Sequence, residues 1–277
     1  MRGHRTSSSA DGAVVTRSGA GGLRSEGTTT VDNVIDPRAI VAERENQAIL
    51  DAFVDRLRHD LAEQHPDVDF AALLVAVRLR AERIERDCEQ LAVDELGALT
   101  VRLTAFVAAT YRVLCEQSTD TPGEPLGEPL GGRLTAAEAE PLVSAAFLEP
   151  MREPVRQGTR AALDTAEDPF AVMVSVAKQR EHGYFGGAFT FVRSADDDQR
   201  YHTDVHRCGY LAVLTAGGAA ELGPVFCRFD AAWIDAIDPE RHGFRFDRPT
   251  TLALGGRSCP FHFTRVRQAH QPDRTAE

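Results

Sequence analysis

Residues 200–208 read Arg-Tyr-His-Thr-Asp-Val-His-Arg-Cys, and the fold expected for the C-terminal half of the chain rests on this stretch. Successive side chains of a strand point to opposite faces of a sheet. If the stretch is extended, its reactive side chains share one face: His202, Asp204, His206 and Cys208. The other face then holds Tyr201, Thr203 and Val205. We therefore predict a strand with one almost wholly reactive face.

Further strands are predicted on both sides of this one. Phe189–Val192 precedes it, and Phe244–Phe246 and Thr250–Leu254 follow it as a pair or as one interrupted strand. Gly255-Gly256 can supply the positive φ angles of a tight turn. This predicts a β-hairpin over Thr250–Val266, with Cys259, Phe261 and Phe263 on one face of its return strand and His262 on the opposite face.

Helices are predicted upstream of this region and within it. Apolar residues recur at helical spacing between residues 49 and 114, as in Ile49, Phe53, Leu57 and Leu61. Thr135–Glu138 matches a capping box, Asp168-Pro169 begins a helix that ends at Gly183, and Pro224–Ile237 reads as helical. The expected fold class is α+β, with a mainly helical N-terminal half followed by an antiparallel sheet packed with helices.

Four parts are predicted along the chain. Residues 1–36 are rich in Ser, Gly and Thr without apolar periodicity, which is typical of a disordered tail. Residues 37–119 form a helical region, and residues 120–134 form a linker because they contain repeated Gly and Pro. Residues 135–277 form the α+β domain.

Composition narrows the classes of function. The chain has 277 residues and a net charge of −11, which disfavours nucleic-acid binding because such proteins usually carry a basic stripe. No apolar run approaches the roughly 20 residues that span a bilayer. Five cysteines without a signal peptide favour reduced thiols. We expect a cytoplasmic protein that acts on a small molecule, with a homo-oligomer left open.

The chemistry is expected between residues 201 and 263, which hold three of the five cysteines and four of the nine histidines. A thiol reacts as its thiolate, and imidazole is well suited to take that proton near neutral pH. The candidate catalytic residues are Cys227, Asp230, Cys208, His206, His202 and Cys259. Cys227 and Asp230, three residues apart on a helix, are the preferred pair. The alternative is that the thiols only fill the core.

A zinc site is the competing explanation for several cysteines and histidines. Structural zinc usually shows a close pair such as Cys-x-x-Cys, and the gaps between Cys208, Cys227 and Cys259 are long. We therefore predict neither a metal nor another cofactor.

The chain resembles the L-2-amino-thiazoline-4-carboxylic acid hydrolase family over roughly Thr135–Val266. The motifs that carry the resemblance are Cys208-Gly-Tyr210, Glu221-Leu-Gly-Pro-Val-Phe-Cys227-Arg-Phe-Asp230, Arg248-Pro-Thr-Thr251 and Gly255-Gly-Arg-Ser-Cys259-Pro-Phe261. The final segment is also similar to small-molecule-binding domains of vinyl-reductase accessory proteins. The first resemblance implies hydrolytic opening of a cyclic amidine to a carbamoyl-cysteine product.

A mechanism of that class needs a nucleophile, a base and a group that binds the substrate. We expect Cys208 or Cys227 to be the nucleophile and His206 or His202 the base, with Asp230 orienting histidine or binding the amidinium. Arg207 or Arg248 would hold a carboxylate, with Tyr210 as a further substrate contact. Two alternatives stay open: a non-catalytic binding or sensor module, and a tailoring enzyme of secondary metabolism with the same fold.

Overall fold

The computed structural model describes residues 36–115 and 134–266. These described residues belong to one compact unit. The predicted tail and linker lie outside the described residues, apart from Asp36 and Leu134 at their edges. The described part is α+β, as predicted, with helices concentrated in the N-terminal half and a four-stranded antiparallel sheet in the C-terminal half.

The N-terminal helices begin where polar side chains satisfy free backbone amides. Their bounds are α1 Pro37–Gln64, α2 Phe70–Asp87, η1 Glu89–Leu91, α3 Glu95–Cys115 and α4 Ala136–Thr165. Asp36 and Asp69 cap α1 and α2. The predicted capping box is confirmed, since the Thr135 amide donates to Glu138 Oε2 at 2.8 Å. Such caps define helix ends by satisfying amides that have no partner within the helix.

One apolar core joins these helices to later segments. The predicted stripe on α1 is confirmed, because Ile49, Phe53, Leu57 and Leu61 are all buried. Cys88 is also buried in this core, whereas Cys115 is half-buried at its edge. The same core includes Phe147 of α4 and Phe226 of a later helix. The helical region at 37–119 therefore shares its core with the domain predicted from residue 135.

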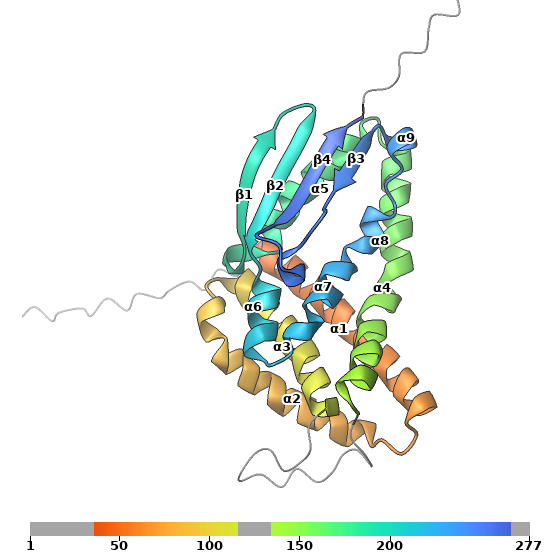
Figure 1. Cartoon of the computed structure of the whole chain (residues 1–277), viewed down its shortest axis with the longest axis vertical. Helices are drawn as coiled ribbons and strands as arrows, with labels where there is room; N and C mark the ends of the chain where they lie inside the picture. The colour runs from red at the N-terminus through yellow and green to blue at the C-terminus, as the bar shows by residue number, and fades with distance from the viewer. Residues whose placement is uncertain (1–35, 116–133, 267–277) are drawn as a thin grey trace, which may run out of the picture. The chain divides into compact units, whose positions relative to one another are not determined.

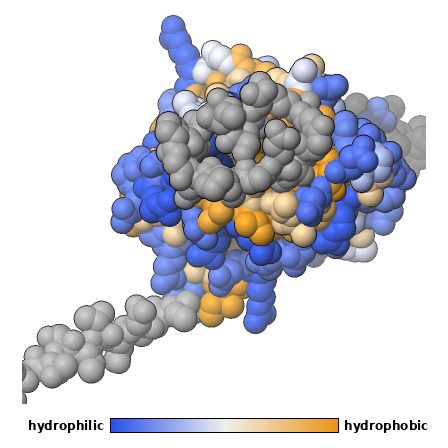
Figure 2. Space-filling view, turned by 90° about the horizontal axis from the view of Figure 1, so that it is seen from below, coloured by the Kyte–Doolittle hydropathy of each residue, from blue (hydrophilic) through white to orange (hydrophobic). Residues whose placement is uncertain are grey.

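Helix α3 is the one helix of the described residues that is long and apolar enough to cross a membrane. Most of it is buried between α1, α2 and α4, as befits a core helix. Figure 2 views the unit from below and shows a mostly hydrophilic face with scattered apolar patches.

The sheet follows helix α5 and the short 3-10 helix η2. The bounds are α5 Pro169–Gly183, η2 Gly186–Ala188, β1 Thr190–Asp196, β2 Arg200–Arg207, β3 Phe244–Asp247 and β4 Cys259–Arg265. The strand order is β1-β2-β4-β3, with every neighbouring pair antiparallel. Helix α5 lies behind the sheet in Figure 1. The predicted start of α5 at Asp168-Pro169 and its end at Gly183 are confirmed.

The predicted hairpin over Thr250–Val266 is wrong in one arm. Its return strand is β4, but β4 pairs with β3 and not with residues 250–254. Residues Leu252–Leu254 form the 3-10 helix η4, which ends at Gly255 with φ +82°. The glycine provides the predicted positive φ angle, yet the turn closes a 3-10 helix instead of a hairpin.

Short helices occupy the connection between β2 and β3. Their bounds are α6 Gly209–Ala216, η3 Ala220–Leu222, α7 Gly223–Phe229, α8 Ala231–Ile234 and α9 Pro239–His242. The predicted helix over Pro224–Ile237 is thus two helices, α7 and α8, that meet at Asp230. Helices α7 and α8 both contact α4, which anchors this connection on the helical core.

The two faces of the sheet differ in burial. Tyr201, Thr203 and Val205 of β2 are buried on the inner face, whereas His202 and Asp204 on the outer face are half-buried. The register continues the inner face into β4, where Val205 lies opposite Cys259 and Thr203 opposite Phe261. The alternation predicted for β2 is therefore confirmed, and its reactive face is the more exposed one.

Thr203 provides a test of this packing. Its hydroxyl is buried, and within residues 36–115 and 134–266 it has no hydrogen-bond partner. Because an unpaired buried hydroxyl costs about 1–3 kcal/mol, we expect Thr203→Val to raise the free energy of unfolding by about 1 kcal/mol. Urea unfolding of the two proteins measures the difference. A loss of stability would mean that the hydroxyl has a partner in solution.

Candidate functional site

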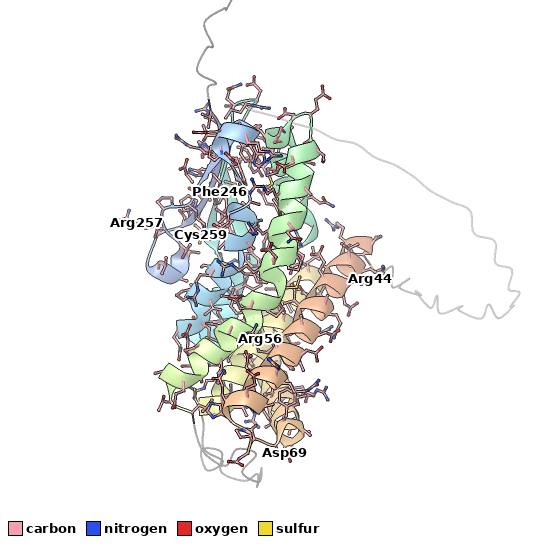
Figure 3. The ribbon with its side chains drawn as sticks, turned by 90° about the vertical axis from the view of Figure 1, so that its right-hand side faces the viewer. Arg44, Arg56, Asp69, Phe246, Arg257 and Cys259 are labelled. Atoms are coloured by element: carbon pink, nitrogen blue, oxygen red, sulfur yellow. The ribbon has the colours of Figure 1, made fainter. Side chains whose placement is uncertain are left out.

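Three cysteines converge around the dipeptide Thr251-Leu252. The Cys227 thiol donates to Thr251 Oγ1 at 3.3 Å, and the Leu252 amide donates to Cys259 Sγ at 3.1 Å. Cys208 packs in the same apolar cluster as Cys259 and Leu252. The three cysteines therefore lie around one short segment of chain. Figure 3 shows Cys259 near Phe246 of the sheet and far from Asp69, the cap of α2.

Cys208 immediately precedes the first residue of helix α6. It is extended, with φ −111° and ψ 114°, and forms the N-cap of α6. Burial raises the pKa of the Cys208 thiol to about 12, although the amides of Leu211 and Tyr210 act in the opposite direction. Helix N-terminal amides favour a thiolate, whereas burial disfavours it. Burial is the larger effect, so the resting thiol is protonated at neutral pH.

Of the other two cysteines, Cys259 is buried and Cys227 is half-buried. Burial likewise raises the pKa of Cys259, which lies on the inner face of β4. Cys227 lies on α7 and is held by its contact with Thr251. Cys227 and Asp230, the preferred pair, are three residues apart along the chain, but the Cys227 thiol donates to Thr251 and the Asp230 carboxylate accepts from Trp233 and Arg248.

Asp230 is bound by an arginine and a tryptophan. The Arg248 guanidinium donates to Asp230 Oδ2 at 2.6 Å and to the Cys227 carbonyl at 2.8 Å. Trp233 Nε1 donates to Asp230 Oδ1 at 3.0 Å. Arg248 also lies over the Phe261 ring, 5.2 Å from the ring centroid. This is within the distance of about 6 Å at which a cation–π contact is favourable. Asp230 thus orients no histidine here, and Arg248 is neutralised by it.

A surface hollow of about 480 Å³ opens beside the cluster. Three predicted residues line it: His206, Arg207 and Cys208. Leu211 of α6 and Leu252 of η4 form part of its apolar wall. Arg207 donates to the Gly187 carbonyl oxygen, which holds its guanidinium at the rim. The hollow brings a thiol, an imidazole and a guanidinium to one accessible place.

His202 lies apart from this hollow. It stacks on His262 of β4 with ring centroids 4.3 Å apart, and its Nε2 lies 2.9 Å from Thr264 Oγ1. His262 in turn contacts Asp204 Oδ1 at 2.9 Å. His202 lies on the outer face of β2, whereas Cys208 follows the end of the strand and packs with Val205 and Cys259 of the inner face. Of the two candidate bases, His206 lines the hollow together with Cys208.

Two residues of the cluster were missed by the sequence interpretation. Tyr184 follows α5, and its hydroxyl donates to Asn46 Oδ1 of α1 at 2.6 Å. Thr251 lies in a predicted strand, yet its hydroxyl accepts a hydrogen bond from the Cys227 thiol. Neither has a local signal, because each acts through a partner that is distant in sequence. Tyr210, predicted as a substrate contact, packs beside Phe189 and Phe226 at the same cluster.

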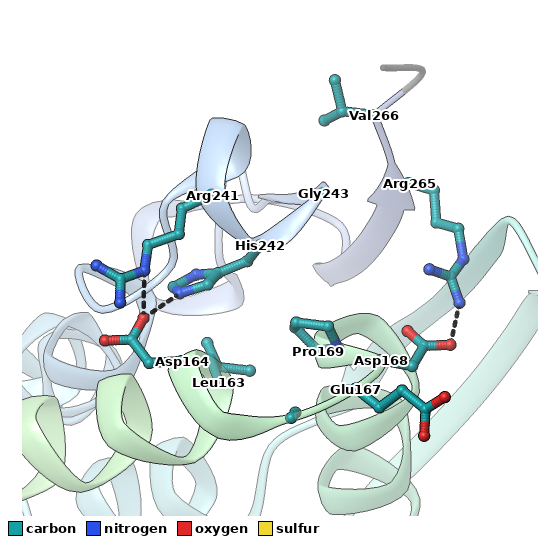
Figure 4. A pocket seen from close by; sticks show the side chains of 11 residues that line it. Leu163, Asp164, Glu167, Asp168, Pro169, Arg241, His242, Gly243, Arg265 and Val266 are labelled. Carbon is teal, nitrogen blue, oxygen red and sulfur yellow. Dashed lines mark hydrogen bonds and ion pairs between the residues drawn. The ribbon is translucent and has the colours of Figure 1, made fainter.

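A second hollow, of about 650 Å³, lies at the junction of α4, α5, α9 and the end of β4 (Figure 4). It contains two sets of ion pairs: Asp164 with Arg241 at 2.7 Å and with His242 at 3.0 Å, and Asp168 with Arg265 at 2.6 Å. No cysteine lines it. Across residues 36–115 and 134–266, no three His, Cys, Asp or Glu side chains are arranged to hold a metal ion.

The burial of Cys208 predicts a loss of stability at high pH. In the unfolded chain the thiol ionises near its ordinary value of 9, whereas in the native protein it stays protonated up to about 12. The stability that the protonated Cys208 thiol contributes to the native state is therefore complete below pH 9. It is lost as the pH rises from about 9 to about 12. We expect the free energy of unfolding of wild type to fall more steeply above pH 9 than that of Cys208→Ala. The difference in slope should approach about 1 kcal/mol per pH unit. Equal slopes in urea unfolding would contradict it.

The Arg248–Asp230 pair predicts unequal effects of two arginine substitutions. Arg248 is 12% exposed, so Arg248→Met should lower the free energy of unfolding by about 2 kcal/mol, because it leaves Asp230 without its counter-charge. The control is Arg245→Met, since Arg245 is 61% exposed in its pair with Asp247 and should cost less than about 0.5 kcal/mol. Similar losses in the two variants would show that burial does not strengthen the Arg248 pair.

Comparison with known protein families places these elements in a defined group. The model of the L-2-amino-thiazoline-4-carboxylic acid hydrolase family matches residues 125–263, half of the 277-residue chain. The match includes the three clustered cysteines, Asp230 and Arg248. No curated protein and no solved structure matches the chain, and the further resemblance to vinyl-reductase accessory domains gains no support. The chain belongs to the L-2-amino-thiazoline-4-carboxylic acid hydrolase family.

Proposed function

We propose that the protein is a hydrolase that opens a small cyclic amidine at a ring C–N bond, with Cys208 as the nucleophile. Family membership supports hydrolysis. The observation that carries the assignment to Cys208 is its place at the N-terminus of α6, in the wall of a hollow shared with His206 and Arg207. Cys227 and Cys259 lack this access in the described hollow and are bound to Thr251 and Leu252 instead.

The proposed reaction consumes one water. His206 takes the proton of the Cys208 thiol, and the sulfur adds to the amidine carbon. The substrate enters as its amidinium, so the ring nitrogen already carries one proton. The ring C–N bond then breaks, the leaving nitrogen takes a second proton from His206, and the exocyclic nitrogen forms the C=N bond of the enzyme-bound intermediate. Water adds to the same carbon and passes a proton to His206. The Cys208 sulfur is expelled and takes that proton, and the proton that entered with the amidinium is released to solvent. The product is the ring-opened carbamoyl compound, and the enzyme returns to its initial state.

Two features of the site support this sequence of steps. The Tyr210 and Leu211 amides at the start of α6 favour the thiolate once a base has taken the proton. Burial keeps the thiol protonated in the absence of a substrate. This protects it from oxidation, because oxidants react with the thiolate and not with the thiol. Arg207 at the rim of the hollow can hold a substrate carboxylate through a two-point contact.

A non-catalytic binding module is the second candidate. The raised pKa values of Cys208 and Cys259 favour it, because protonated thiols in an apolar cluster can line a ligand site without reacting. A tailoring enzyme of secondary metabolism would use the same residues on another heterocycle. Turnover separates the binding module from either enzyme, and the accepted heterocycle separates the two enzymes.

Turnover of L-2-amino-thiazoline-4-carboxylate provides the test. We expect mass spectrometry to show a product heavier by one water, and Cys208→Ser to abolish its formation because the serine hydroxyl is a far weaker nucleophile. His206→Gln should slow the reaction by about a hundredfold or more. Cys115→Ser, on α3 and outside the cluster, should retain wild-type turnover.

Two results would contradict the proposal. Full activity in Cys208→Ser together with loss in Cys227→Ser would move the nucleophile to Cys227. Binding of cyclic amidines without turnover of any would favour the binding module.

A further inference from the structure

Hydrogen bonds connect the start of α3 to the rim of the hollow beside Cys208. Asp94 immediately precedes α3, and its Oδ1 accepts from the Gly97 amide at 2.6 Å, as a capping residue does. Its Oδ2 accepts from the Gly187 amide of η2 at 2.7 Å. The Gly187 carbonyl oxygen in turn accepts from the Arg207 guanidinium. One carboxylate therefore binds both a helix end and the residue that holds Arg207.

The 3-10 helix η2 is packed tightly between the start of α3 and the start of α6. A Cβ added at Gly186, which has φ +59°, would lie 2.6 Å from Asp94 Oδ1. On the other side of η2, a Cβ added at Gly209 would lie 2.9 Å from the Ala188 side chain. Gly209 directly follows Cys208. The contact with Asp94 thus fixes an element that reaches the residue after the proposed nucleophile.

Arg207 differs from Arg248 in its electrostatic surroundings. Arg248 is paired with Asp230 at 2.6 Å, whereas Arg207 forms no ion pair within residues 36–115 and 134–266. A guanidinium has five N–H donors, and the bond to Gly187 leaves others for a ligand. Of the residues that line the hollow in the described part of the chain, Arg207 is the one with a permanent positive charge. An anionic group of a ligand in the hollow is best bound by this arginine.

We propose that Asp94 is a positioning residue for Arg207, and that through Gly187 it keeps the guanidinium where it binds the carboxylate of a ligand in the hollow. This inference rests on the proposed function, since it places the ligand beside Cys208. Asp94 lies outside the residues matched by the family, whereas Gly187 and Arg207 lie within them. The helical N-terminal half thus contributes to the choice of ligand as well as to the core.

Positioning has a measurable effect because Arg207 is exposed. A long exposed side chain loses rotamer entropy when a ligand fixes it, and this loss weakens binding. The bond to Gly187 restricts the guanidinium before the ligand arrives, so less entropy is lost on binding. Loss of the Asp94–Gly187 bond should therefore weaken the binding of ligands with a carboxylate and leave the binding of neutral ligands unchanged.

Two ligands that differ only in a carboxylate test the inference. We would titrate the full-length protein by calorimetry with 2-aminothiazole-4-carboxylate and with 2-aminothiazole, whose aromatic rings resist hydrolysis. Wild type should bind the carboxylate about tenfold or more tightly, as expected for hydrogen bonds between charged groups. Arg207→Met should lose this preference and bind 2-aminothiazole like wild type.

Asp94→Asn separates the contact with η2 from the capping of α3. Asparagine has one acceptor oxygen, so it can cap α3 through the Gly97 amide but cannot also accept from Gly187. We expect its melting temperature to stay close to that of wild type. Its preference for the carboxylate should fall by about threefold or more, as expected when an arginine must be immobilised on binding. Asp94→Ala removes both bonds and should lower the preference equally.

Asp69→Ala is the matched control. Asp69 caps α2 by accepting from the Ala71 and Ala72 amides at 3.0 and 3.1 Å, and it lies far from Cys259 of the thiol cluster in Figure 3. Asp69→Ala and Asp94→Ala each remove a helix cap, so both should lower the melting temperature. The preference for the carboxylate should fall in Asp94→Ala and stay at the wild-type value in Asp69→Ala.

The outcomes are distinct from those of the turnover experiment. The inference is overturned if both Asp94 variants keep the wild-type preference, or if Asp69→Ala lowers the preference as much as they do. It is also overturned if wild type binds the two rings equally, or binds neither at millimolar concentration, even when the thiazoline substrate is hydrolysed. If the preference depends on Asp94 but no cyclic amidine is hydrolysed, the inference holds and the proposed hydrolase fails.

Discussion

The Arg248 guanidinium connects the three segments on which the thiol cluster depends. It binds Asp230 at the junction of α7 and α8, the carbonyl of Cys227, and the ring of Phe261 on β4. Arg248 itself lies just after β3. A planar cation with several donors can hold a carboxylate, a carbonyl and an aromatic face at once, which lysine cannot do with a single ammonium. This contact adds to the Cys227–Thr251 hydrogen bond and to the apolar packing that hold the connection in place.

The thiol cluster is buried and electrically neutral because Arg248 makes these contacts. With Asp230 paired, the cluster contains thiols, hydroxyls and aromatic rings, and it is closed on one side by the inner face of the sheet. An apolar surrounding raises the pKa of a thiol because it disfavours the thiolate. The protein therefore holds Cys208 at a helix N-terminus that favours the reactive form and in a setting that disfavours it. A reaction at this thiol needs a base, and His206 in the adjoining hollow is placed to be one.

The helical N-terminal half supports the thiol cluster. Helices α1, α3 and α4 share a core with α6 and α7, so the segment that bears Cys208 packs on residues far upstream. Gly209 illustrates how close this contact is, since an added Cβ would lie 2.9 Å from Ala188 and 3.2 Å from Thr100 of α3. The Asn46–Tyr184 contact adds a polar link between α1 and the cluster. The family match covers half of the chain, but the cluster is supported by both halves.

Local patterns in the sequence determined the elements. The alternation of side chains along residues 200–208 identified β2 and its buried face, and capping residues located the starts of α4 and α5. Apolar residues that recur every four positions identified the buried stripe of α1. They also indicated that Cys208, Cys227 and Cys259 belong together, because the resemblance to a family lay in the motifs that contain them. These features depend on a residue and its neighbours within a few positions, where backbone geometry alone sets which side chains share a face.

Only the tertiary structure decided which residues meet. Asp230 binds Arg248, 18 residues away, and Tyr184 binds Asn46, 138 residues away, and neither spacing leaves a periodic trace. Residues 250–254 read as a strand, yet β3 occupies the place beside β4, and Thr251 and Leu252 turn towards the thiols instead. His202 and Cys208 were expected on one strand face, yet Cys208 follows the end of β2 and packs with Val205 and Cys259 of the inner face. Hydrogen bonds and burial between distant segments are settled by the packing of the whole chain, so they cannot be read from any short stretch of it.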